Sequence, residues 1–170
     1  MSEKLLDIQD LSVRFNMHDG VVRAVSHVDL SIAKGETLGL VGETGAGKTT
    51  IAKAILRLLP DPPSKIKGGK IFFEGTELLG LPEEQMRKFR GNKIAMIFQD
   101  PMTALNPVKR VGEQIAEGLR INMGLSKSEA KAEAIKMLEM VGIAAERYRE
   151  YPHQFSGGMK QRVVIAMALA

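Results

Sequence analysis

The sequence predicts an α/β fold that is interrupted by an all-helical segment, and three observations support this prediction. Short apolar runs at 37–41 and 93–98 fit strands that are buried on both faces of a sheet. A glycine-rich stretch separates the first run from a helical pattern at 48–59, which must end at Pro60. From 108 to about 147 the pattern is almost entirely helical. We therefore expect three parts, which are residues 1–107, 108–155 and 156–170.

The remaining N-terminal segments alternate between strand and helix patterns. Alternating apolar residues predict strands at 5–15 and 24–32, and the sequence "HDG" at 18–20 marks a turn between them. A further strand, with turns at both ends, is predicted at 68–78. A proline followed by two acidic residues then opens a helix at 82–90. These segments complete the α/β part.

The C-terminal helices have recognisable beginnings. An amphipathic helix is predicted at 111–121, and Ser126 with Glu129 forms a capping-box signal before the helical pattern at 130–141. The last helix begins at "SGG" and runs into the apolar stretch 163–170, with no residue that closes its last turn. We therefore expect the sequence to cover part of a longer protein.

Composition excludes several classes of protein. The chain has 170 residues, a formal net charge of +4 and no cysteine, so disulfides, thiolate metal sites and iron–sulfur clusters are excluded within it. The first ten residues contain acids and no apolar signal region. No run approaches the ~20 apolar residues that a membrane span requires. We expect a cytoplasmic chain that does not itself enter the bilayer.

The strongest motif is "GETGAGKTT" at 42–50, which matches the phosphate-loop pattern G-x-x-x-x-G-K-[ST]. Glycines let backbone N–H groups approach a polyphosphate closely, and the following helix directs its positive end at the same anion. Lys48 is expected to reach the β- and γ-phosphates, and the Thr49 hydroxyl to bind Mg²⁺. The motif predicts a bound nucleoside triphosphate, but kinases, GTPases, helicases and transport motors all use such a loop. The predicted nucleotide contacts are Gly42, Glu43, Thr44, Gly45, Ala46, Gly47, Lys48, Thr49 and Thr50.

Two further motifs follow in a characteristic order. "MIFQDP" contains Gln99, and "FSGGMKQR" begins at residue 155. With the phosphate loop, they resemble the nucleotide-binding domain of ABC-type ATPases over essentially the whole chain. "AMIFQDPMTALNP", "VGEQI" and "YPHQFSGGMKQRVVIAMALA" are similar to ATP-binding subunits of bacterial oligopeptide and dipeptide importers, a subfamily that includes nickel and glutathione importers. The resemblance implies a P-loop NTPase fold, with a RecA-like core, an antiparallel β-subdomain and an inserted all-α signature subdomain, here without the Walker B strand.

The resemblance also implies roles for individual residues. The 42–50 loop corresponds to the Walker A motif, which holds ATP and Mg²⁺, and Gln99 matches the residue that contacts Mg²⁺ and the attacking water. Phe15 stands where the family has an aromatic that stacks on adenine, although a Phe at a strand end is equally a core residue. The signature residues are expected to complete the nucleotide site of a partner subunit in a head-to-tail dimer. They are Ser156, Gly157 and Gly158.

The family pattern further implies partners and a location. The segment 100–107 matches the region that contacts a membrane permease, and a solute-binding protein outside the membrane acts indirectly. The subunit would then be a peripheral protein at the cytoplasmic face of the membrane. The family's Asp-Glu pair and switch His follow the signature helix and are not in this sequence. We therefore expect the 170 residues alone to bind ATP without useful turnover, and 37–41 to lack its usual neighbouring strand.

Three other functions stay open from the residues. The first is a soluble ABC-type ATPase that acts on nucleic acid or ribosomes, although the sequence has no basic stripe or aromatic platform and we expect no nucleic-acid partner. The second is a small-molecule kinase, which gives no reason for "FSGGMKQR". The third is a module that only binds nucleotide. The transported solute, and whether two identical or two different subunits pair, cannot be predicted from this sequence.

Overall fold

The computed structural model describes residues 3–170, which form two compact units divided after Met86. Each unit has its own hydrophobic core, so each is described by itself. The divisions predicted at residues 107 and 155 stay predictions, because compactness alone does not test them. No helix in the described part of the chain is both long enough and apolar enough to cross a bilayer.

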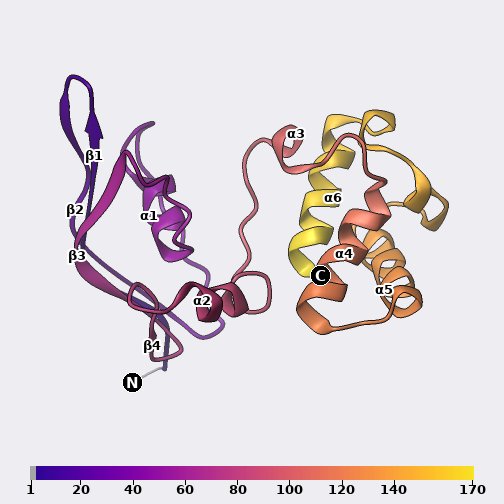
Figure 1. Ribbon diagram of the computed structural model, residues 1–170, viewed down its shortest axis with the longest axis horizontal. Helices are drawn as coiled ribbons and strands as arrows, with labels where there is room; N and C mark the ends of the chain where they lie inside the picture. Colours follow the sequence, from indigo (N-terminus) through magenta and orange to yellow (C-terminus); the bar gives the residue numbers. More distant parts are fainter. Residues whose placement is uncertain (1–2) are drawn as a thin grey trace. The chain divides into compact units, whose positions relative to one another are not determined.

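The first unit is built on a four-stranded antiparallel sheet. Strand β1 (Lys4–Met17) pairs with β2 (Gly20–Ala33) on one side and with β3 (Ser64–Phe73) on the other. The short β4 (Thr76–Glu77) adds to β3, which gives the order β2-β1-β3-β4 (Figure 1). The predicted strands at 5–15 and 24–32 and the turn between them are confirmed, as is an antiparallel β part.

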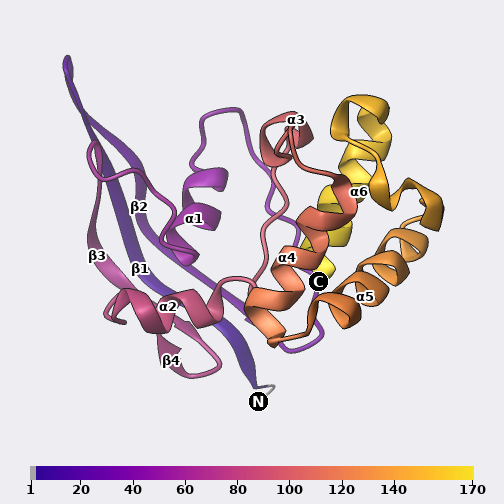
Figure 2. The same cartoon turned by 45° about the vertical axis from the view of Figure 1, so that its right-hand side comes forward.

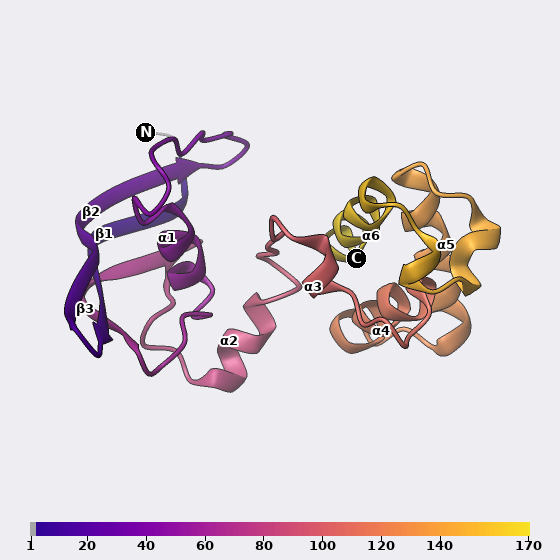
Figure 3. The same cartoon turned by 90° about the horizontal axis from the view of Figure 1, so that it is seen from above.

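The core of the first unit lies between this sheet and helix α1 (Lys48–Ile55), which packs on β2 (Figure 3). Alternate residues of the central strand, among them Leu11 and Val13, are fully buried. Ile51 and Ala54 are buried on the inner face of α1. Buried side chains from alternate strand residues and from one face of α1 therefore pack in one apolar layer. This layer holds the start of α1 against the sheet.

The structure corrects the turn predicted at the beginning of the 68–78 strand. Gly68 and Gly69 lie inside β3, where the pairing with β1 shifts register. Gly69 has a φ of +95°, and a Cβ there would lie 2.6 Å from the carbonyl oxygens of Gln9 and Asp10. Only glycine tolerates this backbone conformation and close approach, so the two glycines form a β-bulge instead of a turn.

Two of the predicted strands and one helix end are also wrong. Neither 37–41 nor 93–98 forms a strand, because a strand requires a neighbour for its N–H and C=O groups. In the described part of the chain, these runs make no ladder, and 93–98 has only an isolated bridge between Ile94 and Arg90. Both runs remain partly exposed; Val41, for example, is 93% exposed. Helix α1 ends at Ile55 instead of residue 59, because Arg57 takes a positive φ of 52° that no right-handed helix accommodates. Helix α2 (Glu83–Phe89) forms as predicted.

The second unit is helical, as predicted from residue 108 onward. Helices α4, α5 and α6 lie side by side (Figure 2) around a core that includes Ile115, Leu138 and Val163. Ser126 and Glu129 form both hydrogen bonds of the predicted capping box at the start of α5. The elements are α3 (Pro101–Ala104), α4 (Val111–Met123), α5 (Lys127–Met140), η1 (Ala145–Arg149), η2 (Pro152–Gln154) and α6 (Gly157–Leu169).

Candidate nucleotide-binding site

The glycine-rich loop at 42–50 runs directly into helix α1 in the first unit. Gly45 and Gly47 have φ values of +89° and +85°, a region that other residues rarely adopt. A Cβ on Gly47 would overlap the carbonyl oxygen of Ala24 in β2, so the loop end lies flat against the sheet. Gly47 caps α1, whose first turn carries no acidic residue. The N-terminus of α1 therefore exposes unpaired N–H groups and a positive dipole end, which is suited to an anion.

The side chain of Lys48 folds back over this loop. Its Nζ donates hydrogen bonds to the carbonyl oxygens of Gly42 and Glu43, both at 2.6 Å. The ammonium group is thus held at the loop opening, beside the N–H groups of the α1 terminus. Thr49, the next residue, is exposed on the first turn of α1. This arrangement can bind a chain of phosphates between backbone N–H groups and one fixed cation.

Phe15 lies in β1 and belongs to the same unit as the loop. It is half-buried and stands opposite Val22 of β2 and Ser64 of β3. Strand β2 also carries Ala24, which meets Gly47. The sheet therefore places Phe15 on the strands that border the end of the phosphate loop, and this position is compatible both with a base-stacking residue and with a core residue.

Gln99 and the signature residues belong to the second unit. Gln99 is exposed and lies in an irregular segment before α3. Ser156 is the N-cap of α6, and its Oγ accepts a hydrogen bond from the N–H of Met159 at 3.4 Å. Gly157 and Gly158 are exposed, with no atom near the position of a Cβ. The signature thus presents a second helix N-terminus that is open to an anion, as its sequence predicts.

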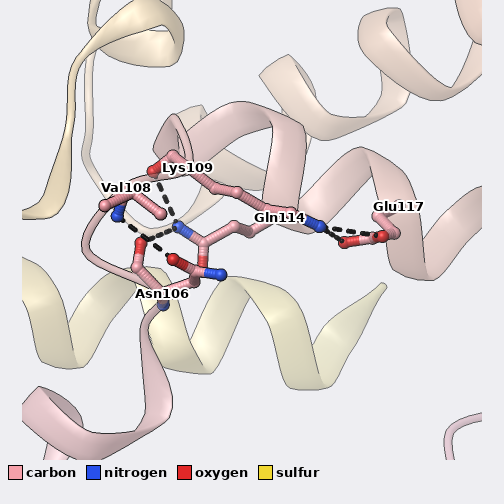
Figure 4. A network of polar contacts seen from close by, with 5 residues as sticks. All are labelled: Asn106, Val108, Lys109, Gln114 and Glu117. Atoms are coloured by element: carbon pink, nitrogen blue, oxygen red, sulfur yellow. Dashed lines mark hydrogen bonds and ion pairs between the residues drawn. The ribbon is translucent and has the colours of Figure 1, made fainter.

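Sequence reasoning missed a buried glutamine, Gln114, that holds the turn at 106–109, where the 100–107 segment ends. Gln114 Oε1 accepts from the N–H of Asn106 at 2.9 Å, and its Nε2 donates to the carbonyl oxygens of Asn106 and Lys109, each at 3.0 Å (Figure 4). The Asn106 side chain in turn accepts from the N–H of Val108 at 3.1 Å. The 106–109 turn is therefore fixed to α4. A polar residue on the apolar face of 111–121 was the signal that could have revealed it.

Sequence reasoning also missed Arg147, which contacts residues on both sides of the signature residue Ser156. Its Nε donates to Glu150 at 2.9 Å, and its guanidinium carbon lies 4.9 Å from the centre of the Phe155 ring. A third contact joins the guanidinium to the thioether of Met159 at 3.2 Å. Because these contacts reach both sides of Ser156, Arg147 fixes the position of the N-cap relative to η1.

Magnesium would require hard oxygen ligands, and the residues present fit that requirement. Within the first unit, Thr49 offers an exposed hydroxyl at the phosphate loop. Gln99 belongs to the second unit, where its side chain is also exposed. In the described residues, no group of three or more His, Cys, Asp or Glu side chains forms a metal cage of its own. A site that draws its remaining ligands from phosphates and water is the usual arrangement for Mg²⁺.

The comparisons with known proteins agree with this geometry. A family model described as "ABC transporter" matches residues 25–170. The oligopeptide transport ATP-binding protein OppD of Bacillus subtilis is 50% identical over 98% of this chain and 47% of its own length. The dipeptide transport ATP-binding protein DppD of the same organism is 48% identical over 98% of this chain and 50% of its own. The chain thus spans about half the length of the curated relatives it matches.

Solved structures show the same fold. A dimeric ATP-binding cassette in a post-hydrolysis state, bound to ADP and Pi, has a TM-score of 0.85 at 27% identity, over 97% of this chain and 69% of that one. A subunit of an ABC transporter complex from Clostridium perfringens has a TM-score of 0.75 at 26% identity, over 99% and 62% of the two chains. The similarity to peptide-importer subunits that the motifs indicate is confirmed by the relatives, and the predicted fold class is confirmed by these structures. The chain belongs to the ABC transporter family of ATP-binding proteins.

Proposed function

We propose that this chain is the nucleotide-binding part of an ATP-binding subunit that drives uptake of oligopeptides, dipeptides or a related solute. The observation that carries the proposal is the phosphate loop, with Lys48 held across its opening by two 2.6 Å hydrogen bonds. The names of the relatives, oligopeptide and dipeptide transport ATP-binding proteins, support the solute class. ATP binding and hydrolysis by the whole protein would supply the energy for transport.

In this proposal the phosphate loop, Phe15 and Gln99 each contact a different part of the bound ATP and Mg²⁺. N–H groups of 42–50 and the Lys48 ammonium bind the phosphates, and Phe15 stacks on the adenine. Thr49 and Gln99 hold Mg²⁺, which when bound offsets the charge that develops on the transferred phosphate. Gln99 also orients the attacking water. Each of these groups acts through position and charge, without covalent chemistry.

The partners follow from the second unit. Ser156, Gly157 and Gly158 would bind the γ-phosphate of ATP held by a second ATP-binding subunit, identical or different. The segment 100–107 would contact a membrane permease, which receives solute from a solute-binding protein. The subunit would therefore work as a peripheral protein at the cytoplasmic face of the membrane. The dimeric cassette among the solved structures supports the pairing of two subunits.

A second candidate is a module that binds nucleotide without hydrolysing it. The signature helix α6 itself contains no Asp or Glu, so it offers no carboxylate of its own that could activate water. We propose that the 170 residues bind ATP and that useful turnover requires the longer parent protein. Comparing the ATPase rates of the two proteins tests this, and robust turnover by the 170 residues would refute it.

The nucleotide proposal is tested with Lys48→Ala. Removal of a charge-assisted contact worth about 1.5–3 kcal/mol should weaken binding of a fluorescent ATP analogue roughly 10- to 100-fold. Lys53→Ala removes the same charge from the last turn of α1 and should leave the affinity near that of the wild type. Equal affinity of all three proteins would contradict the proposal. Loss of peptide uptake in cells that carry the Lys48→Ala parent, with the permease still copurifying, would test the transport role.

A further inference from the structure

A basic cavity lies entirely within the helical unit, among α4, α5 and η1. Its volume is about 490 Å³, which is within the range of small-ligand sites, roughly 300–1,000 Å³. None of the residues predicted to bind nucleotide lines it. Six cationic and two anionic side chains do, which leaves a local charge of +4, equal to the formal charge of the whole chain. The cations are Lys109, Arg110, Arg120, Lys127, Lys131 and Arg149.

The positive charge of this cavity is not balanced internally. Only Lys109 forms an ion pair among the lining residues, with Glu117 at 2.9 Å (Figure 4). Arg120, Lys127 and Arg149 form no ion pair with any residue in the described part of the chain. Three unpaired cations around one cavity repel each other, and an anion with several acceptor oxygens would relieve that repulsion. Arginine favours phosphate in particular, because its planar fork matches two phosphate oxygens.

One wall of the cavity is an aromatic ring in a fixed position. The ring of Tyr148 lies over Gly112 of α4 so closely that a Cβ on Gly112 would overlap it. The Lys131 ammonium lies 5.8 Å from the centre of this ring. Burial, and then the nearby Glu113 carboxylate, raise the pKa of Tyr148, so the phenol stays neutral at physiological pH. Packing therefore fixes the aromatic wall of the cavity, and this wall adds no negative charge.

Glu113 gives the cavity a second chemical requirement. It lines the cavity and makes no hydrogen bond or ion pair with another described residue. A free carboxylate among cations does not suit a bare anion, but it can accept hydrogen bonds from hydroxyl groups. A ligand that combines a phosphate with neighbouring hydroxyls would satisfy both the unpaired cations and Glu113.

We propose that this cavity binds a phosphate ester that carries free hydroxyl groups, such as a glycerol phosphate. The same group occurs free in solution and as the headgroup of phosphatidylglycerol. The site stands apart from the phosphate loop, and the proposal does not rest on the transport function. Its cations bind the phosphate, and Glu113 selects for the hydroxyls.

Titration calorimetry of the full chain, with excess ADP to fill the phosphate loop, tests the free ligand. Glycerol 3-phosphate should bind saturably, and the double variant Arg120→Gln/Lys127→Gln should weaken binding at least about tenfold. The control Arg87→Gln/Lys136→Gln removes the same charges from α2 and α5, outside the cavity, and should bind as the wild type does. Equal weakening in both double variants, or no weakening in either, would overturn the proposal.

Sedimentation with vesicles distinguishes the lipid source. Binding to vesicles of phosphatidylglycerol and phosphatidylcholine, but not of phosphatidylcholine alone, that is lost only in Arg120→Gln/Lys127→Gln would assign the headgroup. Binding of free glycerol 3-phosphate alone would assign a soluble ligand. If neither probe binds to the wild-type protein, the proposal fails.

The role of Glu113 has its own measurement. The wild type should bind glycerol 3-phosphate about five- to tenfold more tightly than propyl phosphate, which lacks the hydroxyls. Glu113→Ala should bind both with equal affinity while it retains phosphate binding. An unchanged preference in this variant would remove Glu113 from the proposed site.

Discussion

Gln114 shows how a single residue can shape a functional surface from beneath. It is only 7% exposed, and its side-chain amide satisfies three backbone groups of the 106–109 turn. A hydrophobic side chain at this position would pack equally well but would leave those groups without partners. The turn that leads from the proposed permease contact into α4 therefore depends on the hydrogen bonds of the Gln114 amide, and not only on the space that its side chain fills.

We predict that Gln114→Leu destabilises the chain by about 2 kcal/mol, because three partly buried backbone groups lose their hydrogen bonds. Urea unfolding followed by circular dichroism measures the change. The matched control is Lys109→Ala, which removes only the exposed ion pair with Glu117 and should cost less than about 1 kcal/mol. A Gln114→Leu protein as stable as the wild type would show that the hydrogen bonds do not hold the turn.

Two physical constraints can require a glycine in the phosphate loop: a positive φ and a lack of room for a Cβ. Gly45 has the first constraint, and Gly47 has both. Both have positive φ, but only at Gly47 would a Cβ also overlap the backbone of β2. We predict that Gly47→Ala abolishes detectable nucleotide binding and lowers stability by about 1–3 kcal/mol, while Gly45→Ala costs about 1 kcal/mol. Calorimetric titration and urea unfolding of both variants measure this. Equal effects in the two variants would mean that strain alone matters.

Residues differ in how far the sequence reveals them. The phosphate-loop glycines, Lys48 and Ser156 could be named as candidates from the sequence because their chemistry requires fixed spacing along one short segment. Gln114 and Arg147 were missed because their partners lie in other turns, and only the folded chain brings those turns together.

At the scale of elements, the capping box predicted at the start of α5 is confirmed. Ser126 Oγ accepts from the N–H of Glu129, and the Glu129 carboxylate accepts from the N–H of Ser126 at 3.0 Å. Interaction of the Glu129 carboxylate with the Ser126 hydroxyl, and then with the Ser126 backbone N–H, holds the pKa of Glu129 below its usual value. The carboxylate therefore stabilises the helix above the ordinary pKa of glutamate and loses this effect as pH falls through the lower folded-state pKa.

We predict that Glu129→Ala lowers the unfolding temperature at pH 7 and that the difference from the wild type shrinks as pH falls below the usual range of a glutamate pKa. Thermal unfolding at a series of pH values measures it. The control Glu139→Ala removes an acidic residue from the last turn of the same helix, outside the capping box. A gap between Glu129→Ala and the wild type that is constant with pH would refute the capping role.

Elements that depend on local order could be predicted, and those that depend on distant partners could not. The hairpin of β1 and β2, helix α2 and the three long helices of the second unit all carry turn or cap signals in their own sequence. The runs at 37–41 and 93–98 have the composition of buried strands, but a strand exists only where a neighbour pairs with it. The glycine pair in β3 was misread because a bulge and a turn use the same residue.

At the scale of the whole molecule, two separate cores make a testable difference. In the absence of a partner subunit, ATP should slow amide hydrogen exchange in 42–51 and leave α4 and α5 unchanged, since the phosphate loop and α1 belong to the first unit and α4 and α5 to the second. With a partner subunit bound through ATP, exchange at 156–158 should slow as well. Exchange mass spectrometry of wild type and Lys48→Ala measures both effects.

Two results would contradict this prediction. Protection at 156–158 that is independent of subunit concentration would mean that the signature binds nucleotide within its own chain. Protection in 42–51 that persists in Lys48→Ala would mean that the loop binds ATP without its lysine.

The order β2-β1-β3-β4 has a consequence for how the protein is made. Strand β1 is synthesised before β2 and β3 and can pair with β2 as soon as that strand follows, but its other edge waits until β3, ending at Phe73, has been synthesised. During that interval the phosphate loop and α1 are already present beside a half-finished sheet. The helical unit, by contrast, joins neighbours that are close in sequence and can form quickly. While residues 33–73 are being synthesised, one edge of β1 therefore stays unpaired. A newly made chain is most exposed to aggregation during this stage.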